Sequence, residues 1–468
     1  MIGDETERTS SSPARAQAIK PRPYLFLVIE AARLEASGLR VSLTGVSELA
    51  IGRGSARKLS STIDGKRTLV VADPRMSTAH ARLVRRAGAL RIVDEGSTNG
   101  STKNGVAVTD APMRDGDVLE LGQTWFLYRE ILEIDDPLDA GDLDAAALAT
   151  TPLGLATFDP KLARSFAQLS RVGASPLSAM LLGETGTGKE VLARALHQLS
   201  KRPGPFIAVN CGAIPQNLVE SHLFGHVKGA FSGAVRDEPG LVRSAQFGTL
   251  LLDEIGDLPA SSQAALLRVL QEGEVLPIGS AHPAKVDVRI MSATHQPLEA
   301  LVEKGRFRRD LYARLAGFIF AVPALRDRMV DLGLLVASLL AGGRVTSKSR
   351  LRLHREAAGA MLRYDWPMNV RELEQCLRAS SVLSEDGLVT TKHLPAAVVD
   401  ALADDGAREP EEAINEADAE LRRELVVKLV EARGNVSEVA RLMGKARQQV
   451  QRWLRRFDLD PESFKERP

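Results

Sequence analysis

The sequence predicts a multidomain protein made of a β-sandwich, an α/β domain with a helical lid, and an all-α domain with a helix-turn-helix. Three observations support this prediction. At 468 residues, the chain is longer than a single hydrophobic core usually organises. The spacing of apolar residues changes along the chain, from short strand-like runs to alternating strand and helix patterns, and then to a basic helical end. A glycine-rich motif of defined spacing lies inside the alternating part.

The composition is that of a globular protein without a membrane span. Apolar residues make up 44% of the chain and charged residues 26%, with a formal net charge of +1. No long uncharged apolar run occurs, and the N-terminus lacks the apolar stretch of a secretory signal, so we expect a cytoplasmic protein. Cys211 and Cys376 stand far apart and outside any Cys/His cluster, which argues against a disulfide framework and a structural zinc site.

The N-terminal part predicts a β-sandwich between two flexible segments. Residues 1–21 are small and polar, as in a disordered tail. From 22 to 131, short apolar runs such as Leu25–Ile29 alternate with Gly, Ser, Asn and Asp turns, which is typical of a sandwich. Residues 132–151 contain no basic residue and predict a solvated acidic linker. The aspartates of this stretch are Asp135, Asp136, Asp139, Asp142 and Asp144.

The rest of the chain divides into an α/β part, a helical part and a basic end. Residues 152–325 repeat a strand, a glycine turn and a helix, which predicts a largely parallel sheet. Residues 326–398 predict a helical lid. A second acidic linker is expected at 399–420. The last segment, 421–460, is rich in Lys and Arg and predicts three helices.

The strongest motif is Gly183–Lys189, which fits the pattern G-x-x-x-x-G-K between a strand-like run and a helical run. Glycines let the backbone wrap a phosphate, and the helix N-terminus adds N–H groups and a positive dipole. A plain glycine turn is the alternative. The Ser or Thr that usually follows the lysine and binds magnesium is replaced by Glu190. The residues expected to bind nucleotide are Gly183, Glu184, Thr185, Gly186, Thr187, Gly188, Lys189 and Glu190.

A second element, in the correct order after the first, strengthens this prediction. The apolar run 248–252 ends in Asp253 and Glu254. Asp253 can hold Mg²⁺ directly or through water, and Glu254 can polarise the attacking water. The two motifs together predict an ATPase with ATP and Mg²⁺ as cofactors.

The stretch from about 152 to 395 resembles the AAA+ domain of sigma-54-dependent transcription activators, the bacterial enhancer-binding proteins. That family characteristically has a glutamate after the P-loop lysine, as Glu190 is here. Its G-A-F-T-G-A loop is similar to Gly229, Ala230, Phe231, Ser232, Gly233 and Ala234. The resemblance implies that this loop contacts the sigma factor and moves with the nucleotide state. Without that context, a buried phenylalanine in a glycine-rich turn would be the alternative.

Other site residues follow from the resemblance. Asn210 matches the asparagine thought to switch the catalytic glutamate. Arg308 and Arg314 match arginines that reach a neighbouring subunit's γ-phosphate, although surface salt bridges are an alternative for both. Arg371 matches the lid arginine that senses nucleotide. Three positions depart from the family pattern and are expected to alter rates rather than abolish activity: Ser232 for threonine, His295 for asparagine and Met368 for glycine.

Four short elements follow one another between residues 50 and 128: 51–53 (Ile-Gly-Arg), 76–80 (Met-Ser-Thr-Ala-His), 96–100 (Gly-Ser-Thr-Asn-Gly) and 104–105 (Asn-Gly). Their order and spacing resembles a forkhead-associated (FHA) domain, a β-sandwich that binds phosphothreonine peptides. An arginine and hydroxyl groups suit a phosphate dianion, and an asparagine can fix a peptide backbone. The resemblance implies that Arg53 and Ser77 hold the phosphate with help from Thr98, and that Asn99 holds the peptide main chain. We expect His80 to support the loop from inside. Turn residues in an unrelated sandwich are the alternative.

Val450, Leu454 and Phe457 recur on one face of the third helix of the C-terminal segment, at about 446–457. The segment resembles the Fis-type helix-turn-helix of these activators. Arg and Gln side chains on the other faces suit base edges and phosphates. A solvated three-helix bundle is the alternative. The expected DNA-binding residues are Arg447, Gln448, Gln451, Arg452 and Arg455.

These modules together predict a sigma-54-dependent transcription activator. We expect ATP hydrolysis by a homo-oligomeric ring, a hexamer by family resemblance, to remodel sigma-54 RNA polymerase at promoters. The FHA domain implies control by a Ser/Thr kinase through a phosphothreonine protein, and the tail is expected to bind upstream DNA as dimers. The two alternatives are an AAA+ protein remodeller without a sigma-factor role and a DNA-binding scaffold with a weak ATPase.

Overall fold

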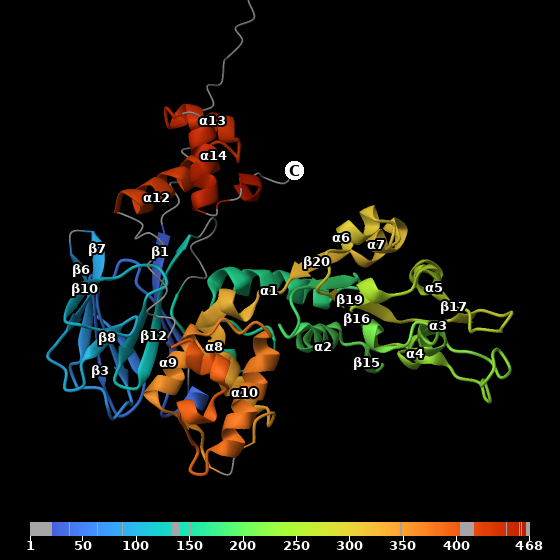
Figure 1. The fold of residues 1–468 in the computed structure, drawn as a ribbon, viewed down its shortest axis with the longest axis horizontal. Coiled ribbons are helices and arrows are strands. Elements are labelled where there is room, and N and C mark those ends of the chain that lie inside the picture. Colours follow the sequence, from blue (N-terminus) through green and yellow to red (C-terminus); the bar gives the residue numbers. More distant parts are fainter. Residues whose placement is uncertain are drawn as a thin grey trace, which may run out of the picture. The chain divides into compact units, whose positions relative to one another are not determined.

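The computed structural model describes residues 21–132, 141–402 and 416–464, apart from ten isolated positions. These positions are 37, 63, 87, 150, 153, 347, 348, 446, 458 and 460. The predicted tail, residues 1–21, therefore lies almost wholly outside the described residues. The chain divides into two compact units: one comprises residues 23–130 and 137–402, and the other contains the C-terminal helices (Figure 1). Among the described residues, no helix combines the length and apolar character needed to cross a membrane.

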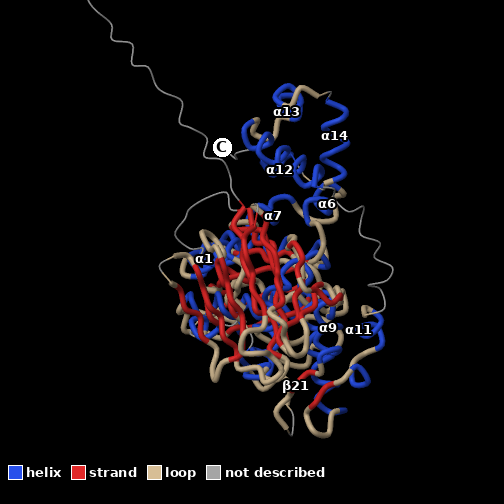
Figure 2. Tube along the Cα trace, turned by 90° about the vertical axis from the view of Figure 1, so that its left-hand side faces the viewer, coloured by secondary structure: helices blue, strands red, loops and turns tan. Residues whose placement is uncertain are grey.

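The N-terminal domain is the predicted β-sandwich, and its strands are prominent in Figure 2. Its first sheet runs in the order β13 (Leu143–Asp144), β2 (Leu39–Ser42), β1 (Pro21–Glu30), β12 (Thr124–Leu132), β11 (Val118–Leu121), β8 (Ser101–Lys103) and β9 (Val106–Val108). The second runs β10 (Asp110–Pro112), β7 (Ala89–Asp94), β6 (Ala81–Arg86), β3 (Glu48–Arg53), β5 (Lys66–Val71) and β4 (Lys58–Ser61). Alternate residues of the strands fill one apolar core, which includes Leu49, Leu69 and Phe126.

The described half of the predicted acidic linker is folded, so the expectation of a solvated linker over 132–151 is wrong there. Strand β13 adds to the first sheet by pairing with β2. Asp142 forms an ion pair with Arg67, and Asp144 forms one with Arg57, 3.0 Å away. The acidic side chains therefore hold this segment on the sandwich by charge complementarity. Asp135, Asp136 and Asp139 lie outside the described residues.

The α/β domain contains a five-stranded parallel sheet in the order β15, β16, β19, β14, β20. These strands are β15 (Phe206–Asn210), β16 (Thr249–Asp253), β19 (Arg289–Thr294), β14 (Ala179–Leu182) and β20 (Phe318–Ala321). Its helices are α1 (Pro160–Gly173), α2 (Lys189–Ser200), α3 (Val219–Phe224), α4 (Gly240–Ser244), α5 (Ala260–Glu272), α6 (Leu298–Glu303) and α7 (Arg309–Leu315). The short strands β17 (Glu274–Val275) and β18 (Ala284–Lys285) form a ribbon. Buried apolar clusters involve the sheet strands and these helices, as expected when parallel strands are covered by helices.

The lid follows directly after β20 and is mainly helical. It comprises the 3-10 helix η6 (Leu325–Asp331), α8 (Leu332–Ala341), α9 (Arg355–Arg363), α10 (Asn369–Leu383) and α11 (Ala396–Asp400), with the small strands β21 (Arg352–Leu353) and β22 (Leu388–Val389). Trp366 is fully buried in it, and its indole N–H donates to the carbonyl of Met361 at 3.0 Å.

The C-terminal unit holds the three predicted helices, α12 (Glu416–Glu431), α13 (Val436–Leu442) and α14 (Arg447–Arg456). Val450, Leu454 and Phe457 are buried against Leu425 and Leu429. The predicted second linker, 399–420, is partly wrong, because α11 extends to Asp400 and α12 begins at Glu416. Acidic residues are favourable in the first turn of a helix, where the backbone dipole is positive.

Candidate functional site

The P-loop, Gly183–Lys189, joins β14 to α2 and contacts the lid. Gly183, Gly186 and Gly188 have φ angles of 157°, 81° and 98°. A Cβ atom at Gly186 would lie 2.1 Å from the carbonyl oxygen of Met368 in the lid, so this position requires glycine. The Arg371 N–H donates to the carbonyl of Gly186 at 3.3 Å. The P-loop and the predicted nucleotide-sensing arginine are therefore brought together.

The turn before α10 accommodates the departure at Met368. Met368 has φ of −98° and ψ of 15°, a conformation open to any L-residue, and α10 begins directly after it. Glycine is therefore not needed at this position to form the turn.

Lys189 lies at the start of α2, in a buried position. Its Nζ donates to the carbonyl oxygens of Gly183 at 2.7 Å and Glu184 at 3.1 Å. Burial lowers the pKa of Lys189, while the carboxylates of Glu254 and Asp253 act in the opposite direction. These neighbours place the lysine charge between the P-loop and the two carboxylates that end β16.

Asp253 and Glu254 meet the P-loop at the carboxyl edge of the sheet. Burial raises the pKa of Asp253, and the neighbouring charge of Glu254 raises it further. A divalent cation at this carboxylate would offset both effects, and the chemistry of an acidic side chain beside a phosphate cradle fits Mg²⁺. Glu190, at the usual position of a magnesium-binding hydroxyl, instead pairs with Arg194 at 2.7 Å and is half exposed.

Glu254 is held by the end of β19. Three donors converge on its Oε2 atom: His295 Nδ1 at 2.8 Å, the Thr294 hydroxyl at 3.4 Å and the His295 N–H at 3.4 Å. Glu254 has φ of 52°, in the left-handed region. Sequence reasoning noted His295 as a departure but missed its contact with the glutamate. Because 41 residues separate the two, no local pattern in the sequence indicates the pair.

Asn210 lies beside Asp253, because β15 and β16 pair these two residues in register. Its Oδ1 accepts from the N–H of Ala213 at 3.2 Å and caps a short 3-10 turn. The asparagine is therefore adjacent to the two carboxylates predicted to be catalytic, but its described bond is to its own loop and not to Glu254.

A cluster from the lid also holds Glu184 of the P-loop. Arg326 forms an ion pair with it, and Asn369 Nδ2 donates to it at 3.1 Å. These bonds bring the pKa of Glu184 down to about 2. Asn369 Nδ2 also donates to the carbonyl of Thr185 at 3.1 Å. Sequence reasoning did not identify Arg326 or Asn369 as part of the site.

The two arginines predicted to act across subunits lie at the two ends of α7. Arg308 precedes the helix and binds Asp310 through two contacts of 3.0 and 2.7 Å. Arg314 is exposed in the last turn of α7. Both side chains are accessible on the surface of the single chain.

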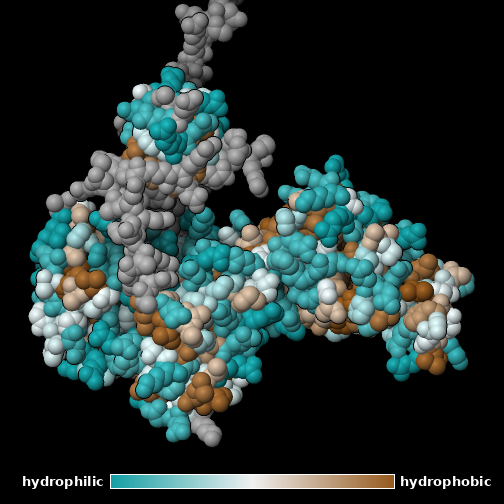
Figure 3. All heavy atoms as spheres, in the orientation of Figure 1, coloured by the Kyte–Doolittle hydropathy of each residue, from teal (hydrophilic) through white to brown (hydrophobic). Residues whose placement is uncertain are grey.

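The loop from Gly229 to Ala234 is a tight turn between α3 and α4. The Gly229 N–H donates to the Ala234 carbonyl at 2.8 Å, and the Ala234 N–H donates to the Phe231 carbonyl at 3.0 Å. Phe231 is 39% exposed, with its ring 4.9 Å from the His226 ring, and Val235 is 80% exposed. Ala230, Ser232 and Gly233 complete this turn, which presents apolar side chains on the surface. Figure 3 shows hydrophobic residues on the otherwise mainly hydrophilic surface at this end of the α/β domain.

The predicted phosphothreonine residues gather at one end of the sandwich. Arg53 is exposed at the end of β3, and its N–H donates to the Ser77 carbonyl at 2.9 Å. The Ser77 hydroxyl accepts from the Thr98 N–H at 3.1 Å. Asn99 Nδ2 donates to the carbonyl of Arg75 at 2.6 Å. The four predicted residues therefore lie on neighbouring loops at this end of the sandwich, which we call the loop cluster.

His80 supports this loop cluster from inside, as predicted. It is fully buried, its Nδ1 accepts from the Ser77 N–H at 3.0 Å, and its Nε2 lies 3.2 Å from the Gly100 carbonyl. Burial lowers the pKa of His80, which favours the neutral ring that these two bonds require.

The predicted DNA-reading helix is α14. Arg447, Gln451 and Arg452 are exposed on it, opposite the buried Val450 and Leu454. The side chains of Gln448 and Arg455 lie outside the described residues.

Comparison with known proteins identifies each module. A family model for the sigma-54 interaction domain matches residues 155–320, and one for an AAA+ ATPase lid domain matches 326–411. An FHA domain model matches residues 49–122, and a homeodomain-like domain model matches 417–462.

Several proteins named as regulatory proteins are similar to this chain. The transcriptional regulatory protein GlrR of Escherichia coli K12 is 41% identical over 322 residues, 67% of this chain and 70% of that protein. The acetoin catabolism regulatory protein of Cupriavidus necator is 43% identical over 323 residues, and the Nif-specific regulatory protein of Azotobacter vinelandii is 43% identical over 295 residues. The matched region covers 67% and 62% of this chain, but only 48% and 56% of these two relatives.

Among solved structures, NtrX from Brucella abortus, in complex with ADP, is 30% identical with a TM-score of 0.47. The similarity covers 66% of this chain and 70% of that one. The matched sequence models and the extent of the similarity to GlrR show the family. This chain belongs to the sigma-54-dependent transcription activators, with an FHA domain before its AAA+ ATPase domain and a helix-turn-helix domain after it.

Proposed function

We propose that this chain forms a homo-oligomeric ATPase ring that opens sigma-54 promoters, under the control of a phosphothreonine protein bound to its FHA domain. The observation that carries the proposal is the convergence of Lys189, Asp253 and Glu254 at one edge of the sheet, with Arg371 of the lid beside the P-loop.

Each side chain has a defined role in hydrolysis. Lys189 would exchange its P-loop carbonyl partners for the phosphates of ATP. Asp253 would hold Mg²⁺, which supplies positive charge to those phosphates when bound. Because the described donors to Glu254 converge on Oε2, we assign Oε1 to the attacking water. Arg308 and Arg314 would stabilise the γ-phosphate of a neighbouring subunit, which makes oligomerisation necessary for turnover.

The exposed loop at Phe231 is the surface proposed to contact sigma-54. An aromatic ring flanked by glycines is accessible without a large movement of the fold, and its turn can change shape at Gly229 and Gly233. The exposed residues of α14, with Gln448 and Arg455 of the same helix, are proposed to bind DNA upstream of the promoter.

A pair of substitutions in the same loop tests the sigma-54 assignment. In Phe231→Ala, we expect ATP hydrolysis to continue while open-complex formation by sigma-54 polymerase is lost. Val235→Ala is the matched control, because it removes an exposed apolar side chain just outside the turn. Open complexes that form equally well with Phe231→Ala would refute the assignment and favour a protein remodeller with another target.

A binding measurement tests the FHA assignment. The full chain should retain a pool of phosphothreonine peptides and not the same pool without phosphate, and Arg53→Ala should abolish this difference. Equal retention of the two pools by the unmodified chain would contradict phosphothreonine recognition.

A further inference from the structure

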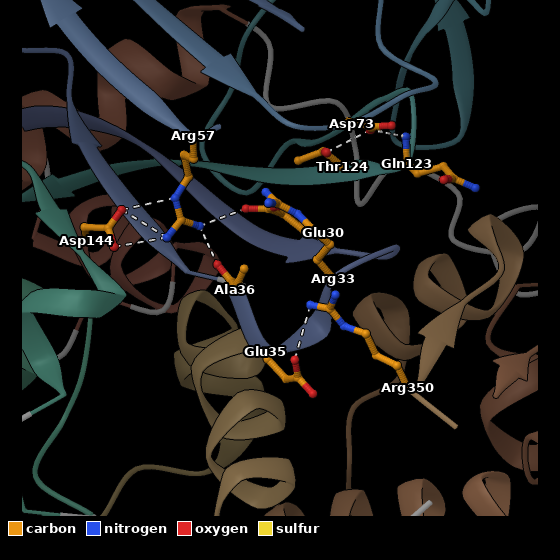
Figure 4. Close-up of polar contacts among 10 residues, drawn as sticks. All are labelled: Glu30, Arg33, Glu35, Ala36, Arg57, Asp73, Gln123, Thr124, Asp144 and Arg350. Atoms are coloured by element: carbon orange, nitrogen blue, oxygen red, sulfur yellow. Dashed lines mark hydrogen bonds and ion pairs between the residues drawn. The ribbon is translucent and has the colours of Figure 1, made fainter. Parts of the chain in front are cut away.

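The FHA domain is in contact with the ATPase lid at several separate points. The 3-10 helix η1 (Leu34–Ala36), between β1 and β2, packs against α8, and Leu34 is fully buried although it lies outside the apolar cluster of the sandwich. The Leu353 N–H of β21 donates to the Ala31 carbonyl at 2.8 Å. Glu35 forms an ion pair with Arg350 at 3.2 Å (Figure 4).

A second set of contacts involves α9 of the lid. Glu120, which is buried on β11, binds Arg355 through two contacts of 2.8 and 2.9 Å. The guanidinium of Arg363 lies over the Trp125 ring, 6.0 Å from its centroid. A Cβ at Gly359 would lie 3.0 Å from the same ring, so the helix approaches the sandwich closely here.

The FHA domain also contacts the segment that leads into the α/β core. The Phe158 carbonyl accepts from Arg40 of β2 at 2.9 Å, while the Phe158 N–H donates to Asp331, at the start of the lid, at 2.7 Å. Gly38 lies against the Phe158 ring, since a Cβ there would be 2.5 Å from it. One peptide segment is thus bound by the FHA domain and by the lid boundary.

The lid boundary in turn contacts the nucleotide loop. Arg328, three residues before Asp331 and almost fully buried, donates to the carbonyl of Thr187 at 3.1 Å. The FHA domain therefore bonds to both sides of the junction between the α/β core and the lid. Lids of this kind must move during turnover, and contacts that span a hinge restrict its motion.

Two polar routes lead from the phosphothreonine residues to this interface. Arg57, in the loop that begins at Arg53, binds Glu30 at 2.9 Å and Asp144 at 3.0 Å, and it also donates to the Ala36 carbonyl of η1. Figure 4 shows these bonds radiating from the Arg57 guanidinium, and Glu30 also binds Arg33.

The second route starts at the loop that carries Ser77. Asp73 of that loop accepts from the Gln123 N–H at 2.6 Å and from the Thr124 hydroxyl at 2.9 Å (Figure 4). The Gln123 carbonyl accepts from the Ala31 N–H at 2.9 Å, and Ala31 is the residue whose carbonyl binds the lid. A ligand that replaces the Arg75 carbonyl as the partner of Asn99 Nδ2 would perturb this same loop.

We propose that the FHA domain is a clamp on the ATPase lid: docked, it restrains ATP turnover, and a phosphothreonine ligand releases it. This inference rests on the phosphothreonine binding proposed for the FHA domain. Because coupling between two equilibria is reciprocal, undocking must also strengthen phosphothreonine binding by the factor with which the ligand weakens docking.

Two substitutions should disrupt the interface between the FHA domain and the lid, one on each of its two sides. Leu34→Asp places a charge in the buried contact with α8. Arg355→Glu, on an exposed lid residue, repels Glu120 without altering the sandwich core. Val106→Asp is the matched control for the first, because Val106 is an apolar FHA residue that is 68% exposed.

Hydrogen exchange of the full chain measures docking directly. In both variants we expect faster exchange in α8 and at Leu353, by about fivefold or more, together with faster ATP turnover. Val106→Asp should match the unmodified chain in both measurements. Unchanged exchange in Leu34→Asp and Arg355→Glu would show that the domains are not docked in solution. Faster exchange with unchanged ATP turnover would refute the restraint.

The ligand effect is measured with the phosphothreonine peptide pool. We expect the pool to accelerate exchange in α8 and at Leu353 in the unmodified chain, and to bind Leu34→Asp more tightly. A pool that binds but leaves exchange unchanged would refute the coupling and leave phosphothreonine recognition intact. A pool that binds neither form would refute recognition and the ligand effect together, whereas the exchange of the variants would still decide whether the domains dock.

Discussion

The contact between His295 and Glu254 leads to a quantitative prediction for catalysis. His295→Ala removes the 2.8 Å donor to Glu254 Oε2 and leaves two donors at 3.4 Å, which are longer than ordinary hydrogen bonds. A bond to a charged group contributes about 1.5–3 kcal/mol when buried. His295 is about half exposed, so we reduce this to about 1 kcal/mol.

This loss predicts a specific kinetic pattern. A cost of about 1 kcal/mol corresponds to a fall of about fivefold in kcat if the bond orients Glu254 toward water. KM for ATP should change by less than about twofold, because the described bonds of His295 do not involve the P-loop. His295→Asn keeps a donor and should stay close to the unmodified rate. Steady-state ATPase assays measure both constants. A kcat that is unchanged or higher in His295→Ala would refute the orienting role.

The remaining predictions concern the carboxylates, the buried histidine and a packed glycine. Glu254→Gln should reduce kcat by about 10²–10⁴-fold while ATP still binds. Glu190→Gln loses only a surface ion pair, so its kcat should stay within about twofold of the unmodified value. Nucleotide titrations measure ATP binding, and turnover assays measure kcat. Burial lowers the pKa of His80 in the folded state, so the unfolded chain takes up a proton at a higher pH than the folded chain. The stability of the FHA domain should therefore be full above about pH 6.5 and fall as the pH drops toward the folded-state pKa. Thermal melting across this range measures the effect, and a melting temperature that does not change with pH would contradict it. Gly52→Ala places a methyl group 1.9 Å from the Thr78 carbonyl oxygen and should destabilise the sandwich by more than about 2 kcal/mol, whereas Gly141→Ala, which points into open space, should leave its melting temperature unchanged.

Local sequence patterns predicted the elements and motifs of the molecule. The P-loop glycines, the β16 carboxylates and the apolar face of α14 depend on spacing within one or two elements, and the structure places them as expected. The same is true of His80, whose role follows from its place inside a turn-rich loop.

Contacts between distant segments could not be predicted in this way. The carboxylates of Asp142 and Asp144 suggested a solvated linker because their partners, Arg67 and Arg57, lie on a strand and a loop far back in the sequence. The docking of η1 on the lid depends on Leu34, a single apolar residue outside any periodic pattern. Such pairings form only when segments that are distant in the sequence pack together.

The measurement that tests the central claim most directly is open-complex formation on a sigma-54 promoter with purified chain, ATP and sigma-54 RNA polymerase, beside Glu254→Gln. We expect open complexes with the unmodified chain in the presence of a phosphothreonine ligand, and none with the variant. Open complexes that form equally well with Glu254→Gln, or none with the unmodified chain despite ATP turnover and bound ligand, would contradict ATP-driven activation of sigma-54 polymerase.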